Sequence, residues 1–294
     1  MTRQAWINGV YTAADEAKIS PFDRGFLFAD GVYEVTCVYG GRPMDLGRHL
    51  DRLERSLKEL GYGALPDRKE LEAVHRKLIA DNGVSEGFVY CQVTRGAYGG
   101  RDFVAPDEPR LTVFLFAEPK ALLDVPAARN GIKVIGVPDI RWSRRDIKST
   151  GLLAQALAKT EAKHRGADDA WLVGADGLVT EAASANAWIV TKQGEIVTRS
   201  LSNAILAGVT RHALFDALGQ RGMKITERSF SLEEAKAAAE AFNTSAVALV
   251  APVVEIDGQP VGAGKPGPVT RSIQHLYYQA LGADVAKAAP WAAD

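Results

Sequence analysis

The strongest hydrophobic pattern in the chain is a run of leucines spaced three and four residues apart. They are Leu46, Leu50, Leu53, Leu57 and Leu60. This spacing places one apolar face along a helix, and Gly61 is a typical residue at the end of such a helix. A second helix is expected to follow Pro66 and Asp67 and to end at Gly83.

Short apolar runs bounded by turn residues predict β-strands in both halves of the chain. In the first half these runs are 32–39, 87–94 and 111–117, after an opening hairpin at 5–11. In the second half they are paired around the turns Asp176-Gly177, Gln193-Gly194 and Asp257-Gly258. Such two-residue turns are typical of antiparallel hairpins. Hairpins with helices interspersed indicate an α+β fold rather than a doubly wound parallel sheet.

The chain is expected to form two domains. Further helices are predicted at 152–164, 208–218, 230–239 and 269–281. Between the two halves, residues 119–130 contain Pro119 and Pro126 and show no strong periodicity, which is typical of an interdomain linker. The sequence therefore predicts an N-terminal α/β domain at 1–118 and a C-terminal domain at 131–294.

The composition is that of a folded globular protein, because 47% of the 294 residues are hydrophobic and 24% are charged. The net charge of -1 gives no reason to expect binding to nucleic acid or to an anionic membrane. Cys37 and Cys91 lie in apolar runs, which favours buried reduced thiols, and the five histidines are too far apart for a metal site. Since no apolar run suits a membrane span or a signal peptide, we expect a soluble cytoplasmic protein.

One lysine stands between an apolar strand and a helix in the second half. The run 132–137 leads into residues 138–150, P-D-I-R-W-S-R-R-D-I-K-S-T, and the helix predicted from residue 152 follows. Lys148 adjoins Ile147, and partial desolvation there favours the neutral amine, a nucleophile that condenses with carbonyl groups. From these residues alone, the alternative is a surface lysine in a charged loop.

A lysine that binds an aldehyde cofactor usually serves pyridoxal phosphate, which makes further demands on the protein. Its pyridine nitrogen needs a carboxylate, for which Glu181 is a candidate in a small-residue loop after a strand. Its phosphate needs N–H groups at a helix start, which Val209 and Thr210 supply. The polar turn 243–246 and Arg52 are further phosphate candidates. Taken singly, each candidate has a simpler alternative: a solvated turn glutamate, an ordinary capped helix or a solvated helix face.

Seven short motifs occur along the chain in a fixed order. They are V-Y-E-V at 32–35, H-L-D-R-L at 49–53, D-I-R-W at 139–142, D-I-K-S at 146–149, T-E-A-A-S-A-N at 180–186, I-L-A-G-V-T-R at 205–211 and P-V-V-E-I-D-G at 252–258. Together they resemble the fold-type IV aminotransferases, which depend on pyridoxal phosphate. The resemblance covers nearly the whole chain, and within this family the sequence looks most similar to the D-amino acid transaminases.

The resemblance implies a role for each candidate residue. Lys148 would form the Schiff base with pyridoxal 5'-phosphate and carry protons, Glu181 would pair with the pyridine nitrogen, and Leu206 would support the ring. The phosphate would be held by Arg52, Val209, Thr210, Ser245 and Ala246. Ala246 stands where the family often has a threonine, so only its N–H is available, at a cost of about 1 kcal/mol for the missing hydrogen bond.

The resemblance also implies the fold, the assembly and the reaction. The fold would have an N-terminal α/β domain and a larger, cofactor-binding C-terminal domain of barrel-like β structure with helices, in a homodimer. The reaction would move an amino group from a D-amino acid such as D-alanine to a 2-keto acid. The alternatives are an (R)-amine transaminase, a branched-chain L-amino acid aminotransferase and a lyase of the aminodeoxychorismate lyase type.

The substrate pocket is expected to contain Tyr33, next to Lys148, together with Tyr90 and Arg101. D-amino acid transaminases commonly carry an R-x-H trap for the substrate carboxylate, whereas this chain has A-Y-G-G-R-D-F at 97–103. A guanidinium binds a carboxylate through two hydrogen bonds, so Arg101 is the predicted anchor. Asp102 either orients Arg101 or repels an anionic substrate, and a pair of loop charges facing solvent is the simpler alternative.

Overall fold

The structure is a computed structural model that describes residues 3–63, 65–105 and 107–292. They form two compact units, Met1–Ala121 with Ile147–Leu152 and Leu122–Asp146 with Leu153–Asp294. The short stretch that carries Lys148 thus belongs to the first unit, although it lies in the second half of the sequence. The independent domains that the sequence predicts, with a linker at 119–130, stay a prediction.

The first unit is built on an antiparallel sheet, which has six strands within the described residues, in the order β2-β1-β6-β5-β3-β4. The strands are β1 (Gln4–Ile7), β2 (Val10–Ala13), β3 (Gly31–Tyr39), β4 (Arg42–Pro43), β5 (Glu86–Thr94) and β6 (Thr112–Pro119). All the strands predicted for this half are confirmed. Side chains alternate across the sheet, so Val89 and Cys91 lie in the core whereas Tyr90 points to the opposite face.

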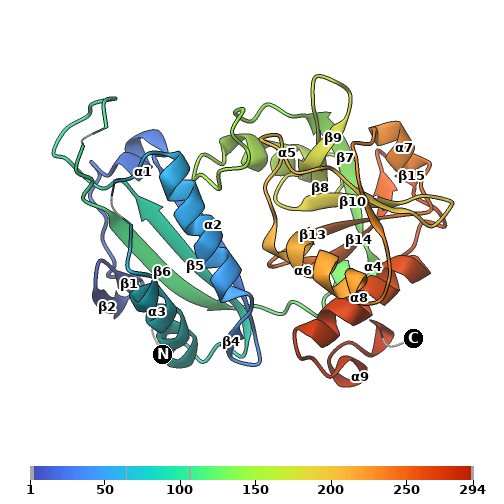
Figure 1. Cartoon of the computed structure of the whole chain (residues 1–294), viewed down its shortest axis with the longest axis horizontal. Coiled ribbons are helices and arrows are strands. Elements are labelled where there is room, and N and C mark those ends of the chain that lie inside the picture. Colours follow the sequence, from blue (N-terminus) through green and yellow to red (C-terminus); the bar gives the residue numbers. More distant parts are fainter. Residues whose placement is uncertain (1–2, 64, 106, 293–294) are drawn as a thin grey trace. The chain divides into compact units, whose positions relative to one another are not determined.

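Helices cover one face of this sheet (Figure 1). They are α2 (Leu46–Glu59) and α3 (Arg68–Asp81), preceded in the chain by the short α1 (Arg24–Phe28). Of the predicted leucine stripe, Leu46, Leu50, Leu53 and Leu57 are buried in the core, whereas Leu60 follows the helix and is partly buried. Asp67 caps α3, because its side chain accepts the N–H groups of Lys69 and Glu70. The fold thus places α2 directly over β3.

The second unit is built on a mixed sheet, which within the described residues follows the order β12-β11-β10-β13-β14-β7-β8-β9, with β15 paired to β14. The strands are β7 (Ile132–Pro138), β8 (Asp169–Val173), β9 (Val179–Ala182), β10 (Asn186–Val190), β11 (Ile196–Thr198), β12 (Ile225–Glu227), β13 (Glu240–Ser245), β14 (Leu249–Ile256) and β15 (Gln259–Pro260). The three predicted hairpins are present. However, β7 pairs in parallel with β8 and β14, and β9 contacts β10, so the sheet curls into a partial barrel.

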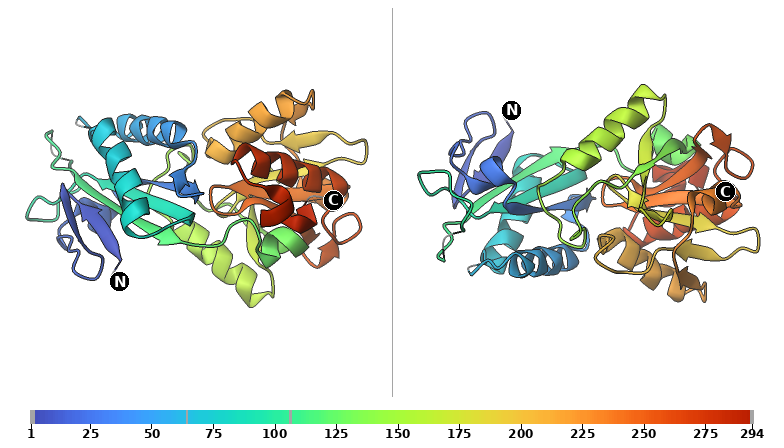
Figure 2. Two further views of the ribbon diagram at one scale, coloured as in Figure 1. Left: turned by 90° about the horizontal axis from the view of Figure 1, so that it is seen from below. Right: turned by 90° about the horizontal axis from the view of Figure 1, so that it is seen from above.

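Helices pack on this second sheet as well (Figure 2). They are α4 (Pro126–Asn130), α5 (Leu153–His164), α6 (Val209–Gly219), α7 (Leu232–Lys236) and α8 (Pro268–Ala280), whereas α9 (Val285–Ala288) packs against α8. The helix α6 contacts α8 and β13, and α5 contacts β7 and β8. The segment expected to be a linker contains α4, whose Ala128 is buried. In the part of the chain that the structure describes, no helix is long and apolar enough to cross a membrane.

Candidate active site

Lys148 is held against β3. Its carbonyl oxygen accepts the N–H of Tyr33 at 3.0 Å, and Ser149 forms a β-bridge with Val32. The Nζ atom of Lys148 lies 4.3 Å from the centroid of the Tyr33 ring. The connection between the end of β7 at Pro138 and the start of α5 at Leu153 is thus where the sequence predicted it, and its last part, Ile147–Leu152, belongs to the first unit.

Three aromatic rings continue from Lys148 across the sheet. Tyr33 stacks on Tyr90 with 5.6 Å between ring centroids, and Tyr90 stacks on Phe116 at 5.2 Å. The hydroxyl of Tyr90 donates to Oε1 of Gln92 at 2.7 Å. Burial raises the pKa of Tyr90, so its hydroxyl stays protonated. The structure therefore brings the predicted residues Lys148, Tyr33 and Tyr90 together.

Arg52 of α2 lies on the side of β3 opposite to the Tyr33 ring. Its side chain is largely buried there and is not on a solvated helix face. It forms a bidentate ion pair with Glu34, in which Nε donates to Oε1 and Nη2 donates to Oε2, both at 2.7 Å. The Nδ1 atom of His49 lies 2.7 Å from Oε2 of the same carboxylate. Sequence reasoning missed both partners, although two of the seven motifs contain them.

Burial by itself would raise the pKa of Glu34, but the charge and hydrogen bonds of Arg52, together with the bond from His49, lower it to about 2. Burial also lowers the pKa of His49, against the opposing effect of Glu34. His49 is therefore neutral at pH 7 and donates Nδ1–H to Glu34. The result is a buried, ionised carboxylate that fixes the orientation of Arg52.

In the second unit, Glu181 at the end of β9 is a buried carboxylate with several donors. Its Oε2 accepts the N–H of Leu206 at 3.2 Å and the Nδ2 of Asn186 at 3.3 Å. Its Oε1 pairs with Nη1 of Arg141. Sequence reasoning did not assign Arg141 to Glu181, because Arg141 comes from a motif 40 residues earlier in the chain.

Asp139 orients Arg141 from the other side. The Nε of Arg141 donates to Oδ1 at 2.9 Å and Nη2 donates to Oδ2 at 2.8 Å, while Oγ1 of Thr180 donates to Oδ2 at 2.7 Å. Burial would lower the pKa of Arg141, but its bonds to Asp139 and the charge of Glu181 raise it. Arg141 is thus a permanent cation held between the carboxylates of Asp139 and Glu181.

The start of α6 offers the predicted N–H groups. Its N-cap is Gly208, which has no side chain to accept hydrogen bonds from the first turn, and the buried Val209 and Thr210 follow. Asn186 donates through Nδ2 to the carbonyl of Leu206 at 2.9 Å. A Cβ at position 208 would lie 2.1 Å from Oδ1 of Asn186. The close approach of Asn186 therefore requires glycine at this helix start.

The polar turn predicted at 243–246 is partly strand, because Asn243, Thr244 and Ser245 are the last residues of β13 and the turn begins only at Ala246. The Cα partner of Asn186 across the sheet is Thr244, so Ser245 and Ala246 come directly after this pair. The Oγ of Ser245 accepts the N–H of Ala248 at 3.0 Å, which stabilises the turn. The turn after β13, the start of α6 and the carboxylate of β9 thus meet around Asn186, to which sequence reasoning assigned no role.

Arg101 lies in the loop between β5 and β6. Its Cζ atom is 4.7 Å from the ring centroid of Phe103 and 5.1 Å from that of Phe28. Oδ1 of Asp102 accepts the N–H of Val104 at 3.0 Å. Among residues 3–63, 65–105 and 107–292, no carboxylate, that of Asp102 included, forms an ion pair with Arg101. Its donors are therefore directed at no acid within these ranges.

The predicted site residues divide between the two units. The first unit contains Lys148, Tyr33, Tyr90, Arg52 and Arg101. The second unit contains Glu181, Leu206, Val209, Thr210, Ser245 and Ala246. Lys148 contacts Tyr33, which stacks on Tyr90, while Arg52 pairs with Glu34 and Arg101 packs against Phe103.

Comparison with known proteins identifies the family. The model of the amino-transferase class IV family matches residues 31–256. The chain is 36% identical over 281 residues to the D-alanine aminotransferase of Bacillus licheniformis, which covers 95% of this chain and 98% of that protein. It superposes on the branched-chain amino acid aminotransferase of Escherichia coli with a TM-score of 0.87 at 24% identity, over 95% of this chain and 94% of that one. The PLP-bound form of a hypothetical aminotransferase from Mycobacterium tuberculosis gives a TM-score of 0.82 at 21% identity, over 94% of this chain and 98% of that one.

The family match runs from the first residue of β3 to the last residue of β14. It includes the Lys148 segment, the Glu34–Arg52 pair, the Arg141–Glu181 pair and the start of α6. The likeness to the two solved structures shows the same fold. The chain therefore belongs to the class IV aminotransferase family.

Proposed function

We propose that this aminotransferase moves the amino group of a D-amino acid, such as D-alanine, to a 2-keto acid. The observation that carries the proposal is Arg101, a guanidinium that packs against two phenylalanine rings and pairs with no acid within the described ranges. Such a group binds the carboxylate of an amino acid or a keto acid through two hydrogen bonds. The similarity to a D-alanine aminotransferase over 95% of the chain supports the D-amino acid as donor.

Pyridoxal 5'-phosphate is the cofactor, and residues of this chain fit its groups. The start of α6 fits a phosphate, because Gly208 leaves the N–H groups of Val209 and Thr210 without a capping side chain. Glu181, buried beside Arg141, fits a protonated pyridine nitrogen. When bound, the cofactor withdraws electrons from the Cα of the donor and makes its proton acidic.

Lys148 supplies the reacting amine. Its Nζ would hold the cofactor and would move the proton of the donor Cα. Tyr33 packs against Nζ and restricts its orientation, and Tyr90 extends this wall toward the substrate. We assign further phosphate contacts to Arg52, Ser245 and Ala246 and support of the cofactor ring to Leu206.

A panel of three donors tests the proposal. D-alanine, L-leucine and (R)-1-phenylethylamine are each supplied with a keto acid to the wild type and to Arg101→Ala. We expect turnover of D-alanine by the wild type and a KM for D-alanine at least tenfold higher in Arg101→Ala, since a charge-assisted contact is worth roughly 1.5–3 kcal/mol. Turnover of the amine, which has no carboxylate, should be unchanged in the variant. Preference for L-leucine would refute the D-amino acid as donor.

The same assay separates transamination from a lyase reaction. Without a keto acid, a transaminase stops after one turnover because the amino group stays on the enzyme. A lyase continues, since it expels a leaving group from Cα and needs no acceptor. Continued turnover of the donor without acceptor would therefore contradict the proposal.

We also propose that the enzyme is a homodimer in the cytoplasm. Large apolar side chains that are exposed within each unit, among them Phe26, Leu153 and Leu157, support an interface between two copies. The buried free thiols of Cys37 and Cys91 suit a reducing compartment. Analytical ultracentrifugation should show a species of twice the mass of the chain, and a monomer at micromolar concentration would contradict this assembly.

A further inference from the structure

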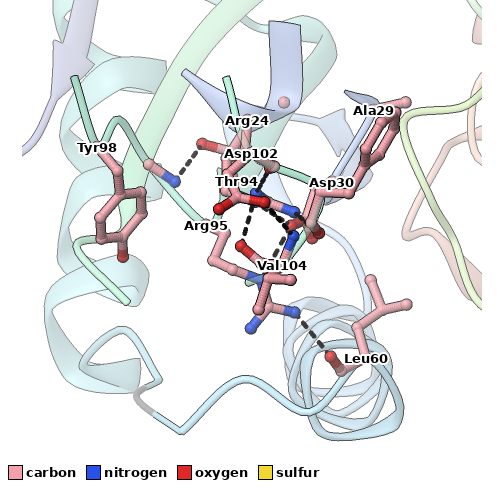
Figure 3. A network of polar contacts seen from close by, with 12 residues as sticks. Arg24, Ala29, Asp30, Leu60, Thr94, Arg95, Tyr98, Asp102 and Val104 are labelled. Atoms are coloured by element: carbon pink, nitrogen blue, oxygen red, sulfur yellow. Dashed lines mark hydrogen bonds and ion pairs between the residues drawn. The ribbon is translucent and has the colours of Figure 1, made fainter. Parts of the chain in front are cut away.

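A buried arginine at the start of α1 holds the loop that carries Arg101. Arg24 is 8% exposed, and its guanidinium donates to three successive carbonyl groups of this loop (Figure 3). Nη1 lies 2.6 Å from the oxygen of Asp102 and 3.4 Å from that of Val104, and Nη2 lies 3.2 Å from that of Phe103. The loop is therefore closed around one fixed cation.

Asp30 holds Arg24 together with a second buried arginine (Figure 3). The Nε of Arg24 donates to Oδ2 of Asp30 at 2.8 Å, and the Nε of Arg95 donates to the same oxygen at 2.9 Å. Arg95 donates through Nη2 to the carbonyl of Leu60 at 2.8 Å, just after α2. The two arginines thus share an acid partner, and Arg24 is the one whose hydrogen bonds reach the loop.

The side chains of this loop lie close to Arg24 as well. The carbonyl groups of residues 102–104 face Arg24, whereas the side chain of Phe103 is 73% exposed. Arg101 packs against this ring and against Phe28, the last residue of α1. The Cζ of Arg24 lies 4.9 Å from the Phe28 ring centroid. Arg24 therefore contacts both residues on which Arg101 rests.

The backbone that follows Arg24 also holds the segment of Lys148. The carbonyl of Gly31 accepts the N–H of Thr150 at 2.9 Å, and Oγ1 of Thr150 donates to the carbonyl of Ala29 at 3.1 Å. Residues 24–31 thus bind the Arg101 loop through Arg24 and the Lys148 segment through Ala29 and Gly31, within the first unit.

We propose that Arg24 is a positioning residue that presets the loop 101–104, so that Arg101 meets the donor carboxylate without first ordering the loop. This inference rests on the proposed function, because it assumes that Arg101 binds the donor carboxylate. A loop that must be ordered on binding lowers affinity, so loss of the contacts raises the KM for D-alanine more than it lowers kcat. Lysine at position 24 retains the charge, but one ammonium group does not reproduce the planar contacts to three carbonyl groups.

The first measurement is the rate at which chymotrypsin cleaves the holoenzyme after Phe103, followed by mass spectrometry. The carbonyl at this bond accepts a hydrogen bond from Arg24, so the loop must open before the exposed Phe103 is cleaved. We expect at least tenfold faster cleavage in Arg24→Lys and the wild-type rate in the matched control Arg95→Lys. Equal rates in all three proteins would overturn the proposal. If Arg24→Lys does not fold, Arg24→Gln, with two N–H donors and no charge, is measured in the same way.

The second measurement is the kinetics with D-alanine. In Arg24→Lys we expect KM to rise at least tenfold with less than a threefold change in kcat, whereas Arg95→Lys retains the wild-type KM. If Arg101→Ala raises KM and Arg24→Lys does not, the role of Arg24 is refuted and the proposed function stands. If Arg101→Ala leaves KM unchanged, the proposed anchor is wrong, and the cleavage rates still decide whether Arg24 holds the loop.

Discussion

Replacing Glu34 by glutamine removes the buried charge that orients Arg52. The pKa of Glu34 is about 2 in the folded protein against 4.5 ordinarily, because the attraction of Arg52 and the bond from His49 outweigh the effect of burial. At about 1.4 kcal/mol for each pKa unit, this difference corresponds to roughly 3 kcal/mol of folding free energy at pH 7. The cost of leaving one partner of a buried ion pair unpaired, about 3–5 kcal/mol, has the same magnitude.

The pH dependence of this contribution has a defined sign. Because the pKa is lowered by folding, the unfolded chain binds more protons than the folded chain between pH 4.5 and pH 2. The contribution of Glu34 is complete above pH 4.5 and is lost as the pH falls toward 2. The stability is measured by urea unfolding of the cofactor-free protein, followed by circular dichroism. At pH 7 the wild type should be more stable than Glu34→Gln by about 3 kcal/mol, and at pH 3 this difference should be smaller by about 2 kcal/mol.

An exposed carboxylate on α2 provides the control. Asp51 pairs with Arg68 at 2.6 Å, but its side chain is 66% exposed, so Asp51→Asn should change stability by about 0.5 kcal/mol or less. A Glu34→Gln variant that is as stable as the wild type at pH 7 would contradict the buried ion pair. A stability difference that stays constant between pH 7 and pH 3 would contradict the lowered pKa.

Three further predictions concern the cofactor. Lys148→Ala should lose all transaminase activity. In the wild type, borohydride in the presence of pyridoxal phosphate should attach the cofactor to residue 148, and labelling of another lysine would show that the assignment is wrong. Glu181→Gln should retain the circular dichroism spectrum but lower kcat at least tenfold, since a neutral amide does not stabilise a protonated pyridine; near wild-type kcat would make Glu181 structural. In a spectral titration, Gly208→Ala should raise the dissociation constant of pyridoxal phosphate about tenfold, because the added Cβ would displace Asn186. The control Gly219→Ala, at the end of α6, should leave this constant unchanged, because a Cβ there meets no atom within 4 Å.

Local patterns were sufficient to predict most of the helices and strands. The leucine spacing predicted α2, and the start of α6 was expected at Gly208, because helical periods and helix starts depend on residues within one or two turns. The strand β13 was missed because its sequence contains Asn243 and Thr244. These polar side chains are buried only because they accept hydrogen bonds from two tryptophan side chains of other strands, each at 2.8 Å.

The sequence by itself determined the fold class, and its motifs indicated Lys148, Glu181 and Arg52. Only the tertiary structure decided which charges meet. Arg52 pairs with a carboxylate 18 residues away, and Glu181 pairs with a guanidinium 40 residues away. Arg24 binds carbonyl groups between 78 and 80 residues away. Partners so distant in the chain share no spacing rule, because the packing of helices on strands sets the distance between them. Each buried charge nevertheless requires such a partner, since an unpaired ion in the protein interior costs several kcal/mol.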